Sequence, residues 1–359
     1  MKLTLPFLGK AGKQRDQIIA VDLGSRTTKA VRLQRQNGGF VLSGYAILDA
    51  PIVEKSISPE MLGEHLKQLN QLLGGKTKVL AMTAGIHDTL VRPADVPMLR
   101  VEELRSVLRL NSRSYLQQDL SSHVFDCQVI PPWYEAEGLE PPKTAAGLQK
   151  QKVLVAGAKQ QLVEELVAGA RIAGFTAEHI IPSLLGPINA FEVAMPDLFK
   201  SQAVVLVDLG FRNSSICILY RGELILTRVV NIGGDRLTAG LSEAMKISYA
   251  EAEGIKVGMA HEVASTLEGL LLPLGRELRA SVDFFEHQQD KAVSQVFLSG
   301  AAAQSDLIVR ALQAELMVDC KPWSAVESFQ LDLPAQQAAE IEQVAPQLTV
   351  ALGVALAAL

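Results

Sequence analysis

The chain has 359 residues, 48% of them hydrophobic, and carries a formal net charge of −5 with a pI of about 5.8. This length can hold two domains with buried cores, and the acidic balance argues against a nucleic-acid partner. The three cysteines lie far apart, in an odd number and without metal-ligand spacing, which argues against a disulfide framework and favours buried thiols in a reducing compartment.

Residues 1–17 contain one short apolar stretch followed by basic residues, and they lack the long apolar core and cleavage site of a signal peptide. The stretch Ile18–Lys29 then predicts an apolar strand that ends in Asp-Leu-Gly at Asp22 and turns into a second strand. The same pattern recurs at Val204–Ser215, where Asp208 aligns with Asp22. A Gly- or Asn-type turn follows each copy, so both copies predict meandering β-hairpins.

The chemistry of these two turns suits the phosphates of a nucleotide. Glycine lets backbone N–H groups approach a phosphate closely, and hydroxyl or amide side chains can donate to its oxygens. Asp22 and Asp208 would face each other and hold a hydrated Mg²⁺, which takes few direct protein ligands. The alternative is that each Asp-x-Gly only closes a hairpin. Two copies in register favour the other interpretation, in which the two hairpins bind one nucleotide between them. The candidate donors are Ser25, Thr27, Thr28, Asn213, Ser214 and Ser215.

Between the two copies, apolar periodicity predicts a helix at Pro59–Leu73 and then a strand at Lys78–Thr83. The pattern changes from about Ala84 to Thr176, where a βαββα order describes a small, self-sufficient α+β subdomain. Trp133 and Tyr134, in its long polar loop, are either a partner anchor or packed against their own subdomain. Its expected elements are Thr89–Pro97, Val101–Gln117, Val124–Ile130, Val153–Ala158 and Gln160–Ala173.

After the second hairpin, Gly233-Gly234 precedes a helix whose N–H groups and positive dipole end suit an anion. Glu253 and Lys256 lie on one helix face, where they either reach a nucleoside or form an ordinary surface ion pair. Small residues at Gly300–Ala302 would let a flat base lie against a strand-to-helix turn, before a helix at Asp306–Leu316. The apolar C-terminus, Leu348–Leu359, is too short to span a bilayer and predicts a buried helix.

In this order the motifs resemble the PilM family of actin-like type IV pilus assembly proteins over nearly the whole chain. The position of the Ala84–Thr176 segment is similar to that of subdomain 1C in PilM and in the division protein FtsA. The stretches that carry the resemblance are AVDLGSRTTKAVRL, EELRSVLRLNSRSYL, FDCQVIPP, VLVAGAKQQLVEEL, ARIAGFTAEHI, VLVDLGFRNSSICIL, GGDRLT, EAEGIK, VFLSGAAA and ALGVALAA.

The resemblance implies an α/β, actin-like (ribonuclease H-like) fold of two domains with duplicated phosphate-binding hairpins. Domain I would comprise residues 1–202 and 334–359, as subdomain 1A with a 1C insert at about 84–176. Domain II would comprise residues 203–333, with a helical subdomain 2B at about 235–289.

It also implies ATP and Mg²⁺ as cofactors. Under this assignment the first phosphate loop is Gly24, Ser25, Thr27 and Lys29, and the second is Asp208, Gly210, Asn213 and Ser214. Gly233 and Gly234 approach the phosphates, Glu253 and Lys256 the nucleoside, and Gly300, Ala301 and Ala302 the adenine. Asp22 and Asp208 hold the Mg²⁺ through water.

Family members grip the N-terminal cytoplasmic tail of the bitopic membrane protein PilN between subdomains 1A and 1C, and so couple the pilus motors to the inner-membrane platform. The chain is therefore expected to be a cytoplasmic ATP-binding scaffold, held at the inner membrane through a PilN-like partner. Motor ATPases are implied as further partners, whereas nucleic acid and a membrane span of its own are not. The expected groove walls are the apolar face of Val101–Gln117 and the strand Val153–Ala158.

Three departures from the family pattern leave alternatives open. Arg26 stands where a small hydroxyl residue is usual, Phe211-Arg212 is bulkier than the usual pair, and the adenine turn has alanine for a second glycine. The arginines could add phosphate contacts, or they could fill the cleft of a degenerate protein that binds no nucleotide. No hydrolytic group is recognisable, so slow ATP turnover or none is expected. A filament-forming protein like FtsA or MreB and a kinase of the same superfamily are the other functional classes.

Overall fold

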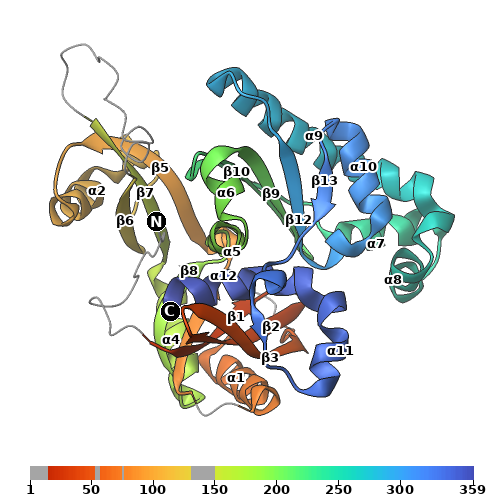
Figure 1. Cartoon of the computed structure of the whole chain (residues 1–359), viewed down its shortest axis with the longest axis horizontal. Helices are drawn as coiled ribbons and strands as arrows, with labels where there is room; N and C mark the ends of the chain where they lie inside the picture. Colours follow the sequence, from red (N-terminus) through yellow and green to blue (C-terminus); the bar gives the residue numbers. More distant parts are fainter. Residues whose placement is uncertain (1–14, 53–56, 75–76, 131–149) are drawn as a thin grey trace.

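The computed structural model describes residues 15–52, 57–74, 77–130 and 150–359. Three β-sheets organise these residues, one in each of two lobes and a smaller one in an insert beside the first lobe (Figure 1). The sheet of the first lobe has the spatial order β14 (Gln330–Leu331), β3 (Gly39–Asp49), β2 (Thr27–Gln36), β1 (Gln17–Leu23), β4 (Val79–Ala84) and β8 (Thr176–Pro182).

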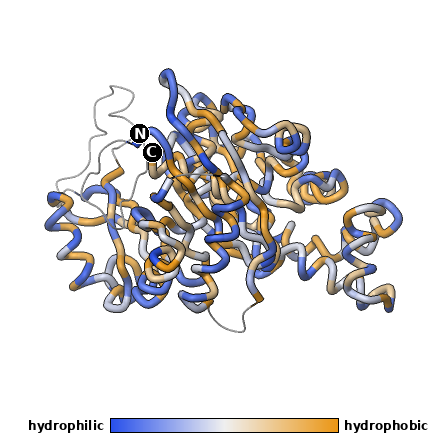
Figure 2. The backbone as a smooth tube through the Cα atoms, turned by 90° about the horizontal axis from the view of Figure 1, so that it is seen from below, coloured by the Kyte–Doolittle hydropathy of each residue, from blue (hydrophilic) through white to orange (hydrophobic). Residues whose placement is uncertain are grey.

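Helices cover both faces of this sheet, which explains why its strand β1 is apolar along most of its length. Ile19 and Val21 face a core that includes α1 (Pro59–Leu73) and α4 (Gln160–Ile172). Their neighbours in β1 face the opposite core, and Figure 2 shows hydrophobic segments alternating with hydrophilic ones through the body of the molecule. The helices on the opposite side and at the lobe's periphery are α5 (Leu185–Ala194), α11 (Ala335–Val344) and α12 (Thr349–Ala358), whereas α6 (Pro196–Ser201) packs against β9 (Ala203–Leu209) and β10 (Ser214–Tyr220) of the second lobe.

The ends of α1 follow from capping residues in the sequence. The Ser58 hydroxyl accepts a hydrogen bond from the backbone N–H of Met61 at 3.3 Å, and Pro59 occupies the first helical position. Gly74 ends the helix in the left-handed conformation, with φ of 60°. The predicted helix Pro59–Leu73 is confirmed at both ends.

His65 makes the stability of this lobe dependent on pH. Its ring Nε2 lies 2.8 Å from Thr28 Oγ1, and the residue is 5% exposed. Burial lowers the pKa of His65, so the unfolded chain takes up a proton at a higher pH than the folded chain does. The stability that neutral His65 contributes is therefore lost as the pH falls below the unfolded pKa of about 6.5, by up to about 1.4 kcal/mol per pH unit.

We expect the free energy of unfolding to fall less steeply between pH 7 and pH 5 in the His65→Gln variant than in the wild type. Urea denaturation at a series of pH values measures this difference. His287→Gln, an exposed position on the second lobe, is the matched control and should follow the wild-type profile. Identical slopes for His65→Gln and the wild type would rule out His65 as the titrating group.

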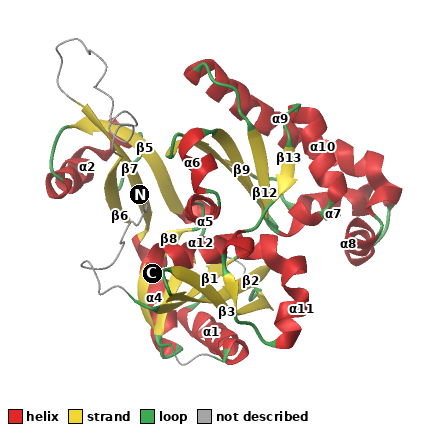
Figure 3. Ribbon diagram, in the orientation of Figure 1, coloured by secondary structure: helices red, strands yellow, loops and turns green. Residues whose placement is uncertain are grey.

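The second lobe repeats the sheet-and-helix design with its own core. Its sheet has the order β11 (Glu223–Val230), β10 (Ser214–Tyr220), β9 (Ala203–Leu209), β12 (Gln295–Ser299) and β13 (Cys320–Pro322). The helices of this second lobe gather at one end of the molecule, on the right in Figure 3. They are α7 (Gly234–Met245), α8 (Tyr249–Gly258), α9 (Ala264–Gln289) and α10 (Asp306–Leu316). The predicted helix Asp306–Leu316 is confirmed.

The two Asp-Leu-Gly hairpins occupy equivalent places in the two sheets. In the first lobe β1 pairs antiparallel with β2 and parallel with β4, and Asp22 lies opposite Lys29. In the second lobe β9 pairs antiparallel with β10 and parallel with β12, and Asp208 lies opposite Ser215. The predicted duplication of the hairpin is therefore present in three dimensions.

The insert forms a three-stranded antiparallel sheet in the order β5 (Thr89–Pro97), β7 (Lys150–Lys159) and β6 (His123–Ile130), covered by α2 (Val101–Leu116). An ion pair of 2.8 Å between Lys152 and Glu223 joins the insert to β11 of the second lobe. Trp133 and Tyr134 lie outside the described residues. The insert has a hydrophobic core of its own, which includes Leu90, Val96, Leu104, Leu108, Phe125 and Val153.

The helix predicted at Gln160–Ala173 is present as α4, but it does not belong to the core of the insert. A Cβ on Gly169 would stand 2.6 Å from the side chain of Leu62, and a Cβ on Gly63 would stand 2.5 Å from that of Ile172. These glycines let α4 pack closely against α1 in the first lobe. The predicted self-sufficient βαββα subdomain therefore included one helix too many, because the compact insert consists of β5, α2, β6 and β7 without α4.

A shared hydrophobic core joins the two lobes. The ring of Phe191, on α5, lies 4.8 Å from that of Phe297 on β12 and 5.3 Å from that of Trp323, measured between centroids. The chain returns to the first lobe soon after Trp323, because Gln330 in β14 pairs with β3. This return precedes the domain boundary that was expected at residue 333.

Within the described residues, one helical stretch, Ala335–Ala358, is long and apolar enough to cross a membrane by length and composition alone. It is 72% buried along its apolar window, as a core helix would be. Its last part, α12, packs against α5 and the first sheet, and all residues from Thr349 to Leu359 are buried. The predicted buried C-terminal helix is confirmed.

Candidate functional site

The two hairpin turns open into one cleft of about 850 Å³ between the lobes. Each turn follows the carboxyl end of a strand with a parallel neighbour, the place where ligands bind in α/β sheets. The first lobe contributes the β1–β2 turn and the short helix η1 (Ile86–Asp88), and the second contributes the β9–β10 turn, α8 and the turn after β12. The predicted residues that line the cleft are Asp22, Gly24, Ser25, Thr27, Lys29, Asp208, Gly210, Asn213, Gly234, Glu253, Lys256, Gly300, Ala301 and Ala302.

Two carboxylates lie at the base of this cleft. Asp22 accepts a hydrogen bond from Thr83 Oγ1 at 3.3 Å and lies 3.5 Å from Lys29 Nζ. Asp208 accepts one from Ser299 Oγ at 2.9 Å. Burial and the nearby charge of Asp22 raise the pKa of Asp208, against the opposing effects of Ser299 and Lys29.

The donor set around these carboxylates fits a hydrated magnesium ion. Burial and the neighbouring Asp22 disfavour the ionised form of Asp208, and a divalent cation between the two carboxylates would favour it. Within the described ranges, no group of three or more His, Cys, Asp or Glu side chains is placed to hold a metal. Two carboxylates acting mainly through water are the coordination that Mg²⁺ accepts and that tighter-binding transition metals do not prefer.

Glycines bring backbone to the surface of the cleft from both lobes. A Cβ on Gly24 would stand 2.5 Å from the carbonyl oxygen of Thr27, and a Cβ on Gly210 would stand 2.6 Å from that of Asn213. Gly300 has φ of +89°, and its Cβ would stand 2.4 Å from the carbonyl oxygen of Leu209. Any side chain at these positions would displace backbone, so the cleft keeps a bare peptide surface of the kind that phosphates and bases contact.

Two of the predicted contacts do not reach the cleft. Ser214 is fully buried and donates its hydroxyl to the carbonyl oxygen of Ile232 at 2.6 Å, while Ser215 lines the cleft instead. Gly233 lies behind the second hairpin, where a Cβ would stand 2.4 Å from the carbonyl oxygen of Phe211. Its role in this conformation is to let the strand-to-helix turn pack closely, which leaves the cleft to Gly234.

Thr28 also points away from the cleft. It is 1% exposed, and its hydroxyl faces His65 beneath the sheet. The reason is the alternation of side chains along β2, which turns Thr27 and Lys29 toward the cleft and Thr28 toward α1. The same alternation along β10 turns Ser215 toward the cleft and Ser214 away from it.

Glu253 and Lys256 lie in the cleft wall and are bound to each other. Lys256 Nζ lies 2.7 Å from Glu253 Oε2, and it also donates to Thr238 Oγ1 at 2.6 Å and to the carbonyl oxygen of Gly234 at 3.1 Å. Burial opposes ionisation of Glu253, but the hydrogen bonds from Lys256 and Thr238 prevail and lower its pKa. These contacts fix the pair in the cleft wall, where the side chain of Lys256 is 12% exposed and that of Glu253 22% exposed.

Two contacts that the sequence did not predict cross the cleft. Arg26 Nη1 lies 3.0 Å from Glu253 Oε1, and Asn213 Nδ2 lies 2.9 Å from His87 Nε2. No local pattern marks His87 as a site residue. Its position directly after a strand parallel to β1 is the one signal that could have placed it at the cleft.

The predicted walls of a peptide groove are wrong. The apolar side chains of α2, including Leu104 and Leu108, are buried in the core of the insert. The strand Val153–Ala158 lies within β7, which is the central strand of the insert sheet and has a neighbour on each side. Within the described residues, the buried face of α2 and both edges of β7 are therefore already occupied.

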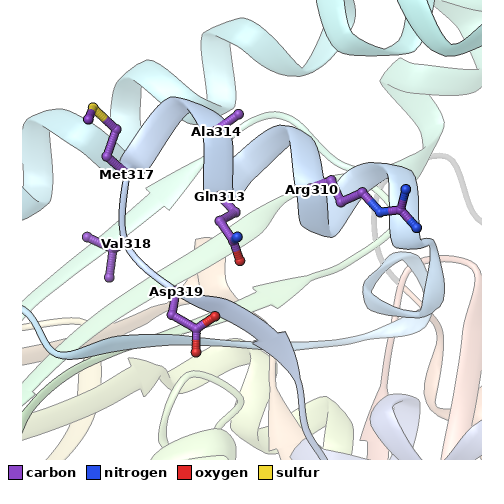
Figure 4. A pocket seen from close by; sticks show the side chains of 6 residues that line it. All are labelled: Arg310, Gln313, Ala314, Met317, Val318 and Asp319. Atoms are coloured by element: carbon purple, nitrogen blue, oxygen red, sulfur yellow. The ribbon is translucent and has the colours of Figure 1, made fainter.

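A second hollow, of about 500 Å³, lies at the C-terminal end of α10 on the surface of the second lobe (Figure 4). Gln313 in this hollow is already engaged, because its Oε1 accepts a hydrogen bond from the backbone N–H of Cys320 at 3.1 Å. None of the predicted site residues lines it. Its lining residues are Arg310, Gln313, Ala314, Met317, Val318 and Asp319.

Comparisons with known proteins agree with this architecture. A sequence profile described as type IV pilus assembly protein PilM matches residues 20–359. The solved PilM-PilN type IV pilus biogenesis complex is similar in structure, with a TM-score of 0.81 and 20% identity over 96% of this chain and 98% of that chain. The ethanolamine utilization protein EutJ from Carboxydothermus hydrogenoformans has a TM-score of 0.54 and 15% identity, over 97% and 92% of the two chains. The predicted actin-like α/β fold is confirmed.

Curated relatives of similar sequence are cell division proteins FtsA. The protein from Bacillus subtilis (strain 168) is 29% identical over 138 residues, which are 37% of this chain and 30% of FtsA. The protein from Streptococcus pneumoniae serotype 2 (strain D39) is 19% identical over 258 residues, which are 66% of this chain and 54% of FtsA. The chain therefore spans only 30% and 54% of the lengths of these relatives.

Proposed function

The chain belongs to the family of the type IV pilus assembly protein PilM, and from this premise we propose that it is a cytoplasmic, ATP-binding scaffold of an inner-membrane assembly platform. The platform would be that of a type IV pilus or of a related secretion or competence system. The observation that carries the proposal is the convergence of both Asp-Leu-Gly hairpins on one cleft, beside an insert with its own core.

In this proposal the cleft binds Mg-ATP. The β1–β2 turn, with Gly24, Ser25 and Thr27, holds the phosphates from the first lobe, and Gly210 and Asn213 hold them from the second. Lys29 neutralises phosphate charge, and Asp22 and Asp208 hold the metal through water. Gly300–Ala302 supports the base, and the fixed pair Glu253–Lys256 lies where the nucleoside enters. The metal, when bound, supplies charge neutralisation between the two carboxylates and the phosphates.

The partner in this proposal is the N-terminal cytoplasmic tail of a PilN-like bitopic membrane protein, which would hold the scaffold at the inner membrane. We place its docking site where β8 of the first lobe meets the insert. β8 is the terminal strand of its sheet among the described residues, and its first half, Thr176–His179, is exposed or half-buried. An extended tail gains affinity by pairing its backbone with such a strand edge. Pilus motor ATPases are the further partners expected of such a scaffold.

Hydrogen exchange measured by mass spectrometry tests this docking site. The probe is the N-terminal peptide of the small membrane protein encoded beside this chain, added in excess to the full-length protein. We expect slower exchange at Thr176–Pro182 and in the adjacent insert, and no change in β13, the far edge of the second sheet. Protection in the second lobe alone, or no protection anywhere, would overturn the proposed docking site.

A further inference from the structure

Arg26 is the cationic residue of the cleft that reaches from one lobe to the other. It leaves the β1–β2 turn, and its guanidinium lies 3.0 Å from Glu253 Oε1 and 5.1 Å above the ring centre of Phe211. Among the cleft-lining residues described, this is the ion pair that joins the two lobes. The Arg26 side chain is 44% exposed, so water screens the pair and its contribution to stability is small.

Glu253 does not depend on Arg26 for its charge balance. Its other oxygen, Oε2, is 2.7 Å from Lys256 Nζ and also accepts the hydroxyl of Thr238. The Lys256 side chain is 12% exposed, so this second pair is the more buried and the less screened of the two. Arg26 can therefore leave Glu253 without stranding an unpaired carboxylate, which would otherwise be costly.

Arg26 also lies within the β1–β2 turn, which would hold phosphate in the proposed function. Gly24 and Ser25 precede it and Thr27 follows it, and all three line the cleft. A guanidinium presents five donors in a plane that matches phosphate oxygens in pairs, and such charge-assisted bonds are about twice as strong as neutral ones. A multiply charged phosphate in the cleft would outcompete the single carboxylate oxygen of Glu253 for this group.

We propose that Arg26 is a phosphate ligand of the cleft, held against Glu253 and Phe211 until a nucleoside triphosphate binds and draws it away. This inference rests on the proposed nucleotide-binding function of the cleft. With Lys29, Arg26 would then favour a nucleotide over a nucleoside, because both side chains carry positive charge toward the phosphates. The same step releases the one ion pair that links the lobes across the described cleft lining, so the lobes gain freedom to adjust around the bound phosphates.

Calorimetric titration of the wild type, Arg26→Ala and Arg26→Gln with Mg-ATP and separately with adenosine tests the proposal. We expect both variants to bind Mg-ATP at least tenfold more weakly than the wild type, which is about 1.4 kcal/mol. Adenosine, which has no phosphate, should bind all three proteins with the same affinity. The melting temperatures without ligand should agree, because the ion pair is exposed.

Arg228→Ala is the matched control. Arg228 pairs with Glu277 at 2.8 Å and is 45% exposed, close to the exposure of Arg26, but it lies outside the cleft. The Arg228→Ala variant should bind Mg-ATP as the wild type does.

Two outcomes would overturn the inference. If the wild type binds Mg-ATP and the Arg26 variants bind it equally well or more tightly, Arg26 only fills the cleft; the inference is then overturned, while the proposed nucleotide function stands. If the wild type binds neither Mg-ATP nor inorganic tripolyphosphate, the inference and the proposed nucleotide function are both overturned.

Discussion

Replacing Gly353 with alanine is expected to destabilise the protein by at least ~3 kcal/mol and to leave little soluble material at physiological temperature. Gly353 lies on α12 where that helix crosses α5. A Cβ at this position would stand 1.7 Å from the carbonyl oxygen of Gly186, and a Cβ on Gly186 would stand 2.7 Å from the carbonyl oxygen of Val350. These are contacts between backbones, so no side chain can move aside to relieve them.

The effect is large because both helices belong to the core that the two lobes share. Separating them would loosen the packing of Phe191 against Phe297 and Trp323, as well as the first sheet. Soluble expression and urea denaturation measure the loss. Gly269→Ala is the control, since Gly269 is in a helix and its Cβ would meet nothing within 4 Å. That change should stabilise by about 0.5–1 kcal/mol, and a Gly353→Ala protein as stable as the wild type would refute the close helix crossing.

Replacing Asp208 with alanine is expected to abolish the stabilisation of the fold by Mg-ATP. A ligand at a hundredfold excess over its Kd stabilises the folded state by about 2.7 kcal/mol, and the variant should lose most of this gain. Burial and the neighbouring Asp22 raise the pKa of Asp208, so its ionised form is disfavoured in the ligand-free fold and a cation would favour it. Removing it should therefore not lower the melting temperature of the ligand-free protein.

Thermal melting with and without Mg-ATP measures this effect. Asp306→Ala is the matched control, because Asp306 is another aspartate at the cleft but its side chain is 77% exposed and no metal role is proposed for it. It should keep the wild-type shift. An equal shift in Asp208→Ala would show that Asp208 holds no metal. No shift in the wild type would favour the degenerate cleft without nucleotide.

Local signals in the sequence predicted the elements well. Ser58, Pro59 and Gly74 cap one helix, and its predicted bounds match the structure. The Asp-Leu-Gly pattern predicted both hairpins because an apolar strand that ends in a glycine turn has few other conformations. Their convergence on a single cleft followed from the duplication, and the comparisons confirm the actin-like fold that it implied.

The features that the sequence did not predict depend on contacts between distant residues. Arg26 and Glu253 are 227 positions apart, so only the fold shows that they meet. Ser214 and Thr28 were expected in the cleft by residue type, but strand alternation turns them inward, toward Ile232 and His65. Similarly, nothing local in the sequence of α4 shows that it packs on α1.

The most direct test of the central claim is a crystal structure grown with Mn²⁺ and a non-hydrolysable ATP analogue. Manganese accepts the oxygen ligands of magnesium and is located by its anomalous scattering. We expect one anomalous peak between Asp22 and Asp208, with the triphosphate lying across Gly24 and Gly210 and the base against Gly300. A nucleotide bound elsewhere, or an empty cleft at saturating analogue, would contradict the account.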